Sequence, residues 1–246
     1  MADSGQIMGR VVKTYDVLDS TNEKAKELID EGVPEGTFVV AKKQVAGKGR
    51  HGRAWASPAG GLYLSVLLEP PEKDAAPFAL LTGISVVKAI RHYGVLAYLK
   101  WPNDVHFMGK KIGGILGEGV HRRDRFFAVI GIGVNTNVSL EDFPEALRGE
   151  ITSIQHEERK VSHEEFLGYF APYYDALYNR YKSASRAMLF KEYRGLCTTI
   201  GKRVVAETKG GKVTGVAADI TTSGALVLVD EAGQRHEVVD AGLRYV

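Results

Sequence analysis

The sequence has a single cysteine and no long hydrophobic run, and each absence removes a class of protein. Cys197 stands alone among 246 residues, which excludes an intramolecular disulfide framework and a cysteine-based zinc site and is typical of a reducing compartment. No apolar run approaches the roughly 20 residues of a membrane span. The first residues also lack the basic-then-apolar pattern of a signal peptide. We therefore expect a cytoplasmic protein that does not associate with membranes.

An excess of charge of one sign is also missing. Lys and Arg number 32 against 30 Asp and Glu, a net charge of +2, so bulk charge gives no argument for nucleic-acid binding. The apolar fraction of 44% is enough for a true core. A chain of this length has room for one large domain, or for a main domain and a small one.

Several catalytic signatures are absent as well. The seven histidines show no metal-ligand spacing, and neither a Gly-x-Ser-x-Gly elbow nor a Walker A sequence occurs. The sequence thus indicates no enzyme nucleophile and no directly assigned metal ligands. Contacts to phosphate would have to come from side-chain cations and backbone amides.

Such cations are concentrated in one segment, Gln44–Arg53, which we call the basic loop. Three glycines and three cations alternate there directly after the apolar run Phe38–Ala41. Gly47, Gly49 and Gly52 satisfy G-x-G-x-x-G, but residues 53–61 cannot form the helix that a dinucleotide-binding unit requires. We interpret the segment as a flexible loop that closes over an anion, with a solvated basic connector as the alternative.

Two later segments again combine lysine with turn residues: Lys100–Asp104 and Lys110–Gly114. The first alone is ordinary turn chemistry. Lys111, however, precedes an apolar strand whose Gly113 and Gly114 would let a ligand approach closely, and a lysine entering a buried strand needs an anionic partner. Residues 131–135 repeat this glycine pattern and end in Asn135.

A further polar cluster, Ser20, Thr21 and Asn22, precedes a helical pattern that runs to Ile29. Ser20 and Glu23 have the spacing of a capping box, which places the cluster at a helix N-terminus. Its members are either caps or ligands for a small polar ring.

The remaining pattern predicts an α+β protein with two domains. Helices are expected over 77–93, 162–181 (with a capping box at Ser162 and Glu165) and 185–196, and strands over 37–41, 61–68, 95–101, 105–107, 111–120 and 125–135. The later strands follow one another as a meander, which favours a mixed, largely antiparallel sheet with flanking helices. Short strands over 204–207, 213–220, 225–230 and 236–239 favour a small C-terminal β-barrel. We place the domains at 1–196 and 197–246.

Together these segments resemble the biotin protein ligases in order and spacing, from about Val12 to the end of the chain. The resemblance implies a class II synthetase-like catalytic domain followed by an SH3-like barrel. It implies that biotin and Mg²⁺-ATP form biotinyl-5′-adenylate, and that a lysine of the biotin carrier domain of a carboxylase or decarboxylase then accepts the biotin. Both monomers and homodimers remain open.

The resemblance also implies roles for individual residues. Biotin would contact Ser20, Thr21, Asn22, Gln44, Gly49, Arg50, Lys111, Gly113 and Gly114, and ATP would contact Lys48, Arg50, Arg53, Trp55, Asn103, Lys111 and Asn135. Lys48 and Arg50 would fold over the carboxylate and phosphates, Lys111 would bridge them, and Trp55 would pack on the adenine. Asp104 would help to deprotonate the acceptor lysine, which completes a catalytic set of Lys111, Arg50, Lys48 and Asp104.

Two departures from the family qualify this picture. The family usually has Arg where this chain has Lys48, so a point charge replaces a bidentate fork and the adenylate is expected to be held less tightly. Only residues 1–11 precede the first strand that matches, too few for the DNA-binding helix-turn-helix of some members, so no DNA partner is expected.

Two other functions stay open. Lipoate ligases and octanoyltransferases share a related catalytic fold, but their ligand lacks the ureido ring of biotin. Alternatively, Lys48, Arg50 and Arg53 could bind single-stranded nucleic acid, with Trp55 stacking on bases.

Overall fold

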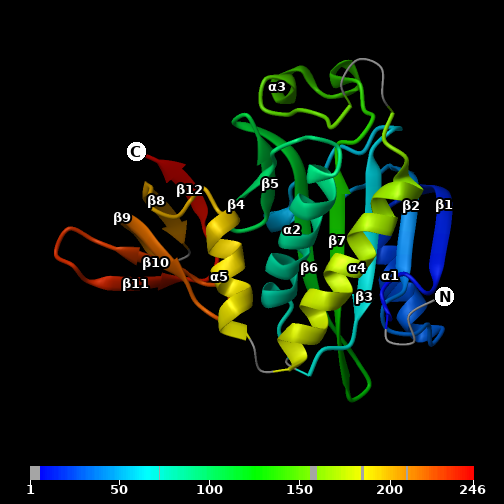
Figure 1. Ribbon diagram of the computed structural model, residues 1–246, viewed down its shortest axis with the longest axis horizontal. Helices are drawn as coiled ribbons and strands as arrows, with labels where there is room; N and C mark the ends of the chain where they lie inside the picture. The colour runs from blue at the N-terminus through cyan, green and yellow to red at the C-terminus, as the bar shows by residue number, and fades with distance from the viewer. Residues whose placement is uncertain (1–5, 72, 156–159, 184–185, 209) are drawn as a thin grey trace.

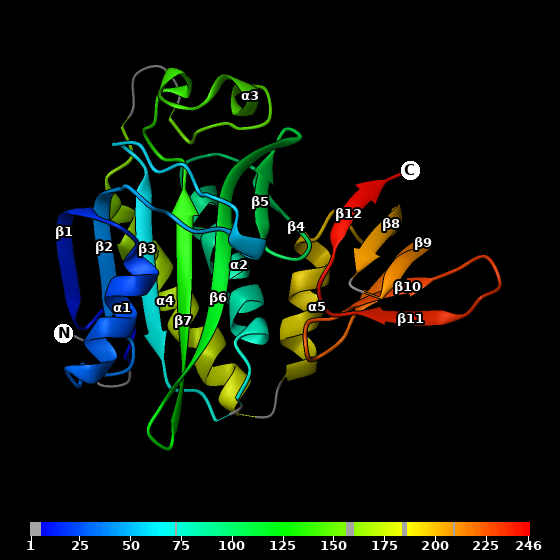
Figure 2. The ribbon, with the colours of Figure 1, turned by 180° about the vertical axis from the view of Figure 1, so that it is seen from behind.

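Two β-sheets organise the protein (Figures 1 and 2). The structure is a computed structural model that describes residues 6–246 except 72, 156–159, 184–185 and 209. The larger sheet has seven strands in the order β1-β2-β3-β7-β6-β5-β4. Their bounds are β1 Val12–Leu18, β2 Phe38–Gln44, β3 Leu62–Leu68, β4 Tyr98–Lys100, β5 Asp104–Phe107, β6 Lys110–Arg122 and β7 Arg125–Val134.

The pairing of this sheet is mixed but mostly antiparallel, as the sequence predicts. Only β1 and β2 are parallel, and every other neighbouring pair is antiparallel. The strand expected over 95–101 is shorter than predicted. Ala97 donates its N–H to the carbonyl of Val95 at 2.8 Å, a tight turn that delays the start of β4 to Tyr98.

Helices cover one face of the sheet and part of the other. The long helices α2 (Ala76–Arg91) and α4 (His163–Lys182) lie over one face, with α5 (Arg186–Leu196) beside them (Figure 1). Helix α1 (Thr21–Asp30) lies over the opposite face (Figure 2). Side chains alternate along a strand, so Leu64 of β3 joins the large core under α2 while Leu67 packs against α1.

Helix α1 covers only part of its face. Its apolar residues Ala25, Leu28 and Ile29 pack on the sheet around Val39 and Val129. Beyond the helix, Gly114 of β6 and Gly131 and Gly133 of β7 leave a cavity on this face of the sheet.

The C-terminal sheet has five antiparallel strands in the order β11-β10-β9-β8-β12. Their bounds are β8 Arg203–Thr208, β9 Gly211–Ile220, β10 Leu226–Val229, β11 Arg235–Val238 and β12 Gly242–Tyr245. The sequence pattern missed β12, because this edge strand is largely exposed and has no apolar alternation. It also missed the short helix α3 (Glu145–Arg148), whereas α5 agrees with the prediction from Arg186 onward; Ser185 lies outside the described residues.

Trp101 joins the two sheets. Its side chain is buried, its backbone N–H donates to Thr199 Oγ1 at 3.1 Å, and its indole Nε1 donates to the carbonyl of Gly224 at 3.0 Å. An ion pair between Arg194 of α5 and Asp219 of β9 supports the same interface at 2.6 Å. The C-terminal sheet is therefore held against the β4–β5 turn. No helix in the described part of the chain is long and apolar enough to cross a membrane.

Candidate functional site

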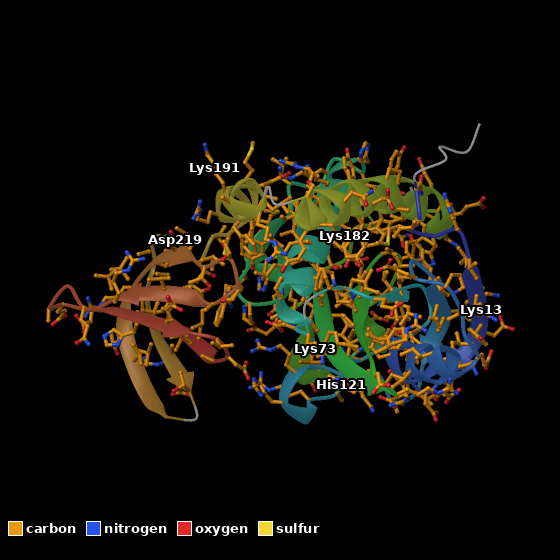
Figure 3. The ribbon with its side chains drawn as sticks, turned by 90° about the horizontal axis from the view of Figure 1, so that it is seen from below. Lys13, Lys73, His121, Lys182, Lys191 and Asp219 are labelled. Carbon is orange, nitrogen blue, oxygen red and sulfur yellow. The ribbon has the colours of Figure 1, made fainter. Side chains whose placement is uncertain are left out.

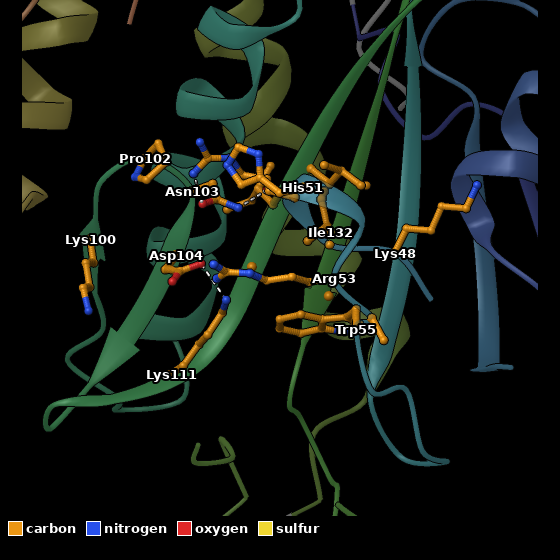
Figure 4. A pocket seen from close by; sticks show the side chains of 18 of the residues that line it. Lys48, His51, Arg53, Trp55, Lys100, Pro102, Asn103, Asp104, Lys111 and Ile132 are labelled. Carbon is orange, nitrogen blue, oxygen red and sulfur yellow. Dashed lines mark hydrogen bonds and ion pairs between the residues drawn. The ribbon is translucent and has the colours of Figure 1, made fainter. Parts of the chain in front are cut away.

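The open face of the sheet contains a cavity of about 500 Å³ that brings distant segments together (Figure 4). It is lined by residues 20–22, 44, 48–51, 53–55, 100–104, 111, 114–116, 131–133, 207 and 241–244. The start of α1, the basic loop, the β4–β5 turn, β6, β7 and the C-terminal sheet thus all contribute.

Glycines make room for the floor of this cavity. A Cβ added to Gly133 would lie 2.4 Å from Trp55 Nε1, and one added to Gly114 would lie 3.0 Å from Trp55 Cζ3. A Cβ added to Gly131 would lie 2.4 Å from Asn22 Oδ1. The indole and the amide can therefore lie directly on the sheet only because these strand positions carry no side chain.

A hydrogen-bonded network fixes the polar groups at the start of α1. Thr21 donates from both its N–H and Oγ1 to Gln44 Oε1, at 2.8 and 3.1 Å. Ser65 Oγ lies 2.8 Å from Thr21 Oγ1 and 2.6 Å from Asn22 Oδ1, and Asn22 Nδ2 donates to Glu118 Oε2 at 2.6 Å. All but Gln44 and Glu118 are buried, so these donors and acceptors are held in one arrangement before any ligand arrives.

The predicted capping box at Ser20 is wrong. Ser20 is the N-cap residue, but its side chain makes no capping hydrogen bond. Glu23 instead pairs with Lys26 at 2.9 Å and with Lys48 at 2.7 Å, because two ammonium groups compete successfully with a backbone N–H for its carboxylate. The second predicted box is half present, since Ser162 Oγ accepts from the N–H of Glu165.

The basic loop is a hydrogen-bonded hairpin. Gly49 donates its N–H to the carbonyl of Arg53 at 2.7 Å, and Trp55 donates to Gly47 at 2.9 Å. The chain reverses at His51 (φ 56°) and Gly52 (φ 71°), in the left-handed region that favours glycine. This turn is what aims the neighbouring cations in different directions.

Arg50 and Lys48 both line the cavity, but their charged groups point in different directions. Arg50 Nη1 donates to Asn103 Oδ1 at 3.2 Å, and its Nη2 contacts the Asp240 carboxylate of the C-terminal sheet region. Lys48 extends toward Glu23 of α1, away from the Asp104 and Lys111 pair (Figure 4). Burial lowers the pKa of Arg50 while Asp104 opposes that shift, so its poorly hydrated charge is suited to an anionic ligand.

Asp104 and Lys111 form an ion pair at the other side of the cavity. Their Oδ1 and Nζ atoms are 2.7 Å apart, and the Lys111 ammonium lies 5.1 Å from the centre of the Trp55 ring. Burial alone would raise the pKa of Asp104, but the neighbouring His106 and Lys111 outweigh it and lower that pKa. Asp104 is therefore ionised over the physiological range.

Comparison with known proteins gives matches over the segments that form this cavity. Residues 14–135 match the biotin/lipoate A/B protein ligase family, and residues 199–242 match the biotin protein ligase C-terminal domain. The bifunctional ligase/repressor BirA of Bacillus subtilis is 35% identical over 234 residues, which cover 93% of this chain and 72% of that protein. The chain belongs to the biotin protein ligase family.

Other members of the family extend this match. The biotin–[acetyl-CoA-carboxylase] ligase of Mycobacterium tuberculosis is 32% identical over 253 residues, covering 94% of this chain and 88% of that protein. The biotin protein ligase of Aquifex aeolicus in complex with biotin and ATP superposes with a TM-score of 0.84 at 29% identity, over 96% of this chain and 100% of that one. The family resemblance seen in the sequence, with its mixed sheet and C-terminal β-sheet domain, is confirmed.

Most of the site residues expected from the sequence line the cavity; Gly113 and Asn135 do not. Gly113 lies one position from Gly114, so the strand alternation turns it to the opposite face, beside Val105. Asn135 follows the end of β7 and is buried, with its Nδ2 donating to the carbonyl of Thr152 at 3.0 Å. The ligand contacts expected for Gly113 and Asn135 stay predictions.

The sequence analysis missed Ser65, which binds Thr21 and Asn22 from behind without lining the cavity, and several residues that do line it. Ser65 is a buried polar residue inside an apolar strand, and that mismatch is a signal that could have revealed it. Residues 207 and 241–244 come from the C-terminal sheet, and no local pattern connects them to the basic loop. The described residues contain no cluster of three His, Cys, Asp or Glu side chains able to hold a metal ion.

Proposed function

We propose that this protein uses ATP to join biotin to a lysine of a carrier protein, through biotinyl-5′-adenylate. The observation that carries the proposal is the cavity in which a hydrogen-bonded polar network meets several cationic side chains, Arg50 and Lys111 among them. Arg50 and Lys111 reach it from the basic loop and from β6, and the Thr21–Asn22 network closes its other end. Family membership supports the same reaction.

The polar network suits the ureido ring of biotin. A ureido group has one carbonyl oxygen and two N–H groups and needs fixed donors and acceptors. Such groups are present here in a fixed arrangement, since Ser65 binds Thr21 and Asn22, Asn22 donates to Glu118, and Thr21 donates to Gln44. Lipoate has no ureido group to use them, so unpaired polar groups would oppose its binding.

The two cations address the electrostatic problem of the first step. The biotin carboxylate must approach the α-phosphate of ATP, and both groups are negatively charged. Fixed positive charge reduces this repulsion, and holding the two groups in line supplies much of the remaining catalysis. We assign Lys111 and Arg50 to this task, and Trp55 to packing against the adenine. Magnesium enters with ATP as part of that substrate.

The second step needs a base near the adenylate. The acceptor lysine arrives as an ammonium ion and must lose a proton before it can attack. Asp104 is ionised and faces the cavity next to Lys111, so we assign it to this contact. The partner is the biotin carrier domain of a carboxylase or decarboxylase, and we assign the reaction to the cytoplasm, where buried Cys197 would stay reduced.

We also propose that residues 1–196 form the catalytic domain and residues 197–246 a second domain. The end of α5 at Leu196 and the start of β8 at Arg203 support this boundary. Residues 241–244 of the second domain line the cavity, so it completes the site.

The test is ATP–pyrophosphate exchange, which reports the first step without the carrier. Exchange should depend on biotin and not on lipoate, and Lys111→Ala should abolish it. Lys110→Ala is the matched control, because Lys110 is exposed and does not line the cavity. Exchange that lipoate supports as well as biotin, or that survives Lys111→Ala, would refute the assignment. Transfer of labelled biotin to a carrier domain then tests the second step.

A further inference from the structure

His106 lies behind Asp104 and has an unused ring nitrogen. The two residues are two positions apart on β5, so they share one face of the strand. His106 is 8% exposed, and its Nε2 lies 3.8 Å from Asp104 Oδ2. Among the described residues, this buried Nε2 has no hydrogen-bond partner. A buried polar atom left in this way calls for an explanation.

The other ring nitrogen indicates which tautomer is present. Nδ1 of His106 lies 3.4 Å from the carbonyl oxygen of Gly109, which can only accept a hydrogen bond. This contact favours the neutral tautomer with its proton on Nδ1, in which Nε2, 3.8 Å from the Asp104 carboxylate, is open to protonation. Protonation of Nε2 would give both N–H groups an acceptor, Gly109 on one side and Asp104 on the other.

The ring is also held in place from the neighbouring strands. Tyr98 of β4 pairs with His106 in register, their rings are 6.1 Å apart at 27°, and Tyr98 accepts a hydrogen bond from the N–H of Gly109 at 2.9 Å. Lys111 pairs with His106 from β6. Tyr98, Lys111 and Asp104 are therefore the titratable neighbours of the ring on its own strand and on the two strands beside it.

If Asp104 is to accept a proton from the carrier lysine, it needs a neighbouring group that can take that proton over. Lys111, and His106 once it carries a proton on Nε2, lower the pKa of Asp104, so this carboxylate passes a proton on rather than keeping it. A neutral imidazole has one free lone pair and can accept that proton. Resting on the proposed function, we infer that His106 accepts, through Asp104, the proton that the carrier lysine releases in the amide-forming step.

The step balances as follows. The lysine ammonium gives one proton to Asp104, which passes it to His106 Nε2. The free amine attacks the carbonyl carbon of biotinyl-adenylate, a C–N bond forms, and the C–O bond to AMP breaks. The second proton leaves the new amide nitrogen with the phosphate of AMP. His106 later returns its proton to water.

The experiment measures single-turnover transfer of biotin from preformed biotinyl-adenylate to a carrier domain between pH 5.5 and 9. His106→Asn keeps a donor that can reach Gly109 and removes Nε2, whereas His106→Phe removes both nitrogens. Both variants should slow transfer at neutral pH at least about tenfold, since proton transfer typically contributes about 10²–10⁴ to rate. The deficit should shrink as pH rises, and biotin-dependent pyrophosphate exchange should stay within about twofold of the wild type, because adenylation does not use this proton.

His121→Asn is the matched control for the same chemical change, since His121 (labelled in Figure 3) is exposed near the end of β6 and does not line the cavity. It should transfer biotin like the wild type. Wild-type transfer and an unchanged pH profile in His106→Asn would overturn the inference and leave the proposed function standing. Equal losses of exchange and transfer would also overturn it, because they indicate a structural role. A wild type without biotin-dependent exchange would overturn both.

Discussion

Replacing Gly133 by alanine tests whether the floor of the cavity depends on a missing side chain. The new Cβ would lie 2.4 Å from Trp55 Nε1, 2.5 Å from Cε2 and 2.8 Å from Cζ2. Nonbonded carbon atoms prefer separations of about 3.5–4.0 Å, so the rigid indole would have to retreat by about 1 Å. The movement would disturb its contact with Gly114 and with the Lys111 ammonium.

The cost follows from overpacking. An extra methyl group forced into a close-packed site typically costs about 1–3 kcal/mol. We expect Gly133→Ala to lower the free energy of unfolding by this amount and to raise the KM for ATP in pyrophosphate exchange. Gly114→Ala should cost less, because its Cβ would approach Trp55 no closer than 3.0 Å.

A double-mutant cycle identifies Trp55 as the cause. Urea unfolding is measured for the wild type, Gly133→Ala, Trp55→Ala and the double variant. With the indole removed, the methyl group has room, so Gly133→Ala should cost less than about 0.5 kcal/mol in that background. The same loss in both backgrounds would refute the steric argument, and so would a Gly133→Ala variant with wild-type stability and exchange.

Three further predictions concern other parts of the chain. Glu23→Gln removes the ion pair that holds Lys48 away from the ligand. Because exposed ion pairs contribute at most about 1 kcal/mol, the affinity for biotinyl-adenylate should rise by up to about fivefold at low salt. A calorimetric titration at high salt should show a smaller increase. Gly168→Ala, within α4 and with nothing within 4 Å of its new Cβ, should raise the free energy of unfolding by about 0.5–1 kcal/mol in the same urea assay; destabilisation would show that the position is not open. Burial lowers the pKa of His163 although the backbone of Gly60 opposes it, so the unfolded state binds the proton first as the pH falls below 6.5. The free energy of unfolding should therefore decrease from pH 7 toward the lowered pKa, and His163→Asn should remove that slope in a pH series of unfolding curves.

Most elements of the fold were predictable because their signals are local. The apolar spacing of α2 and α4 and the β-branched runs of β2 and β3 predict those elements to within three residues of their bounds. The meander from β4 to β7 follows from short turns such as Met108–Gly109, where both residues have positive φ. The predictions that failed depend on competition between distant groups. Glu23 pairs with Lys48 rather than capping α1, and β12 forms only because β8 offers it an edge.

The residues of the candidate site also fall into those that the sequence could predict and those that it could not. Arg50, Trp55 and Lys111 were singled out from their sequence context, and all three line the cavity. Gly113 was included beside Gly114 because a motif does not show which face each residue occupies. Ser65 and residues 241–244 were left out because their relation to the cavity arises from strand pairing and from the contact between the two sheets.

The amino-acid order by itself determined which residues carry charge, which positions lack a side chain and which segments become helix or strand. These properties depend on chemistry within a few neighbouring residues. The tertiary structure alone decided that Arg50 faces Asn103, that Lys48 turns to Glu23, and that the buried ring of His106 lies beside the Asp104 carboxylate. Each of these contacts depends on strand register and on the packing of the two sheets. Register decides which side chains share one face of the sheet, and packing brings together residues that are far apart along the chain.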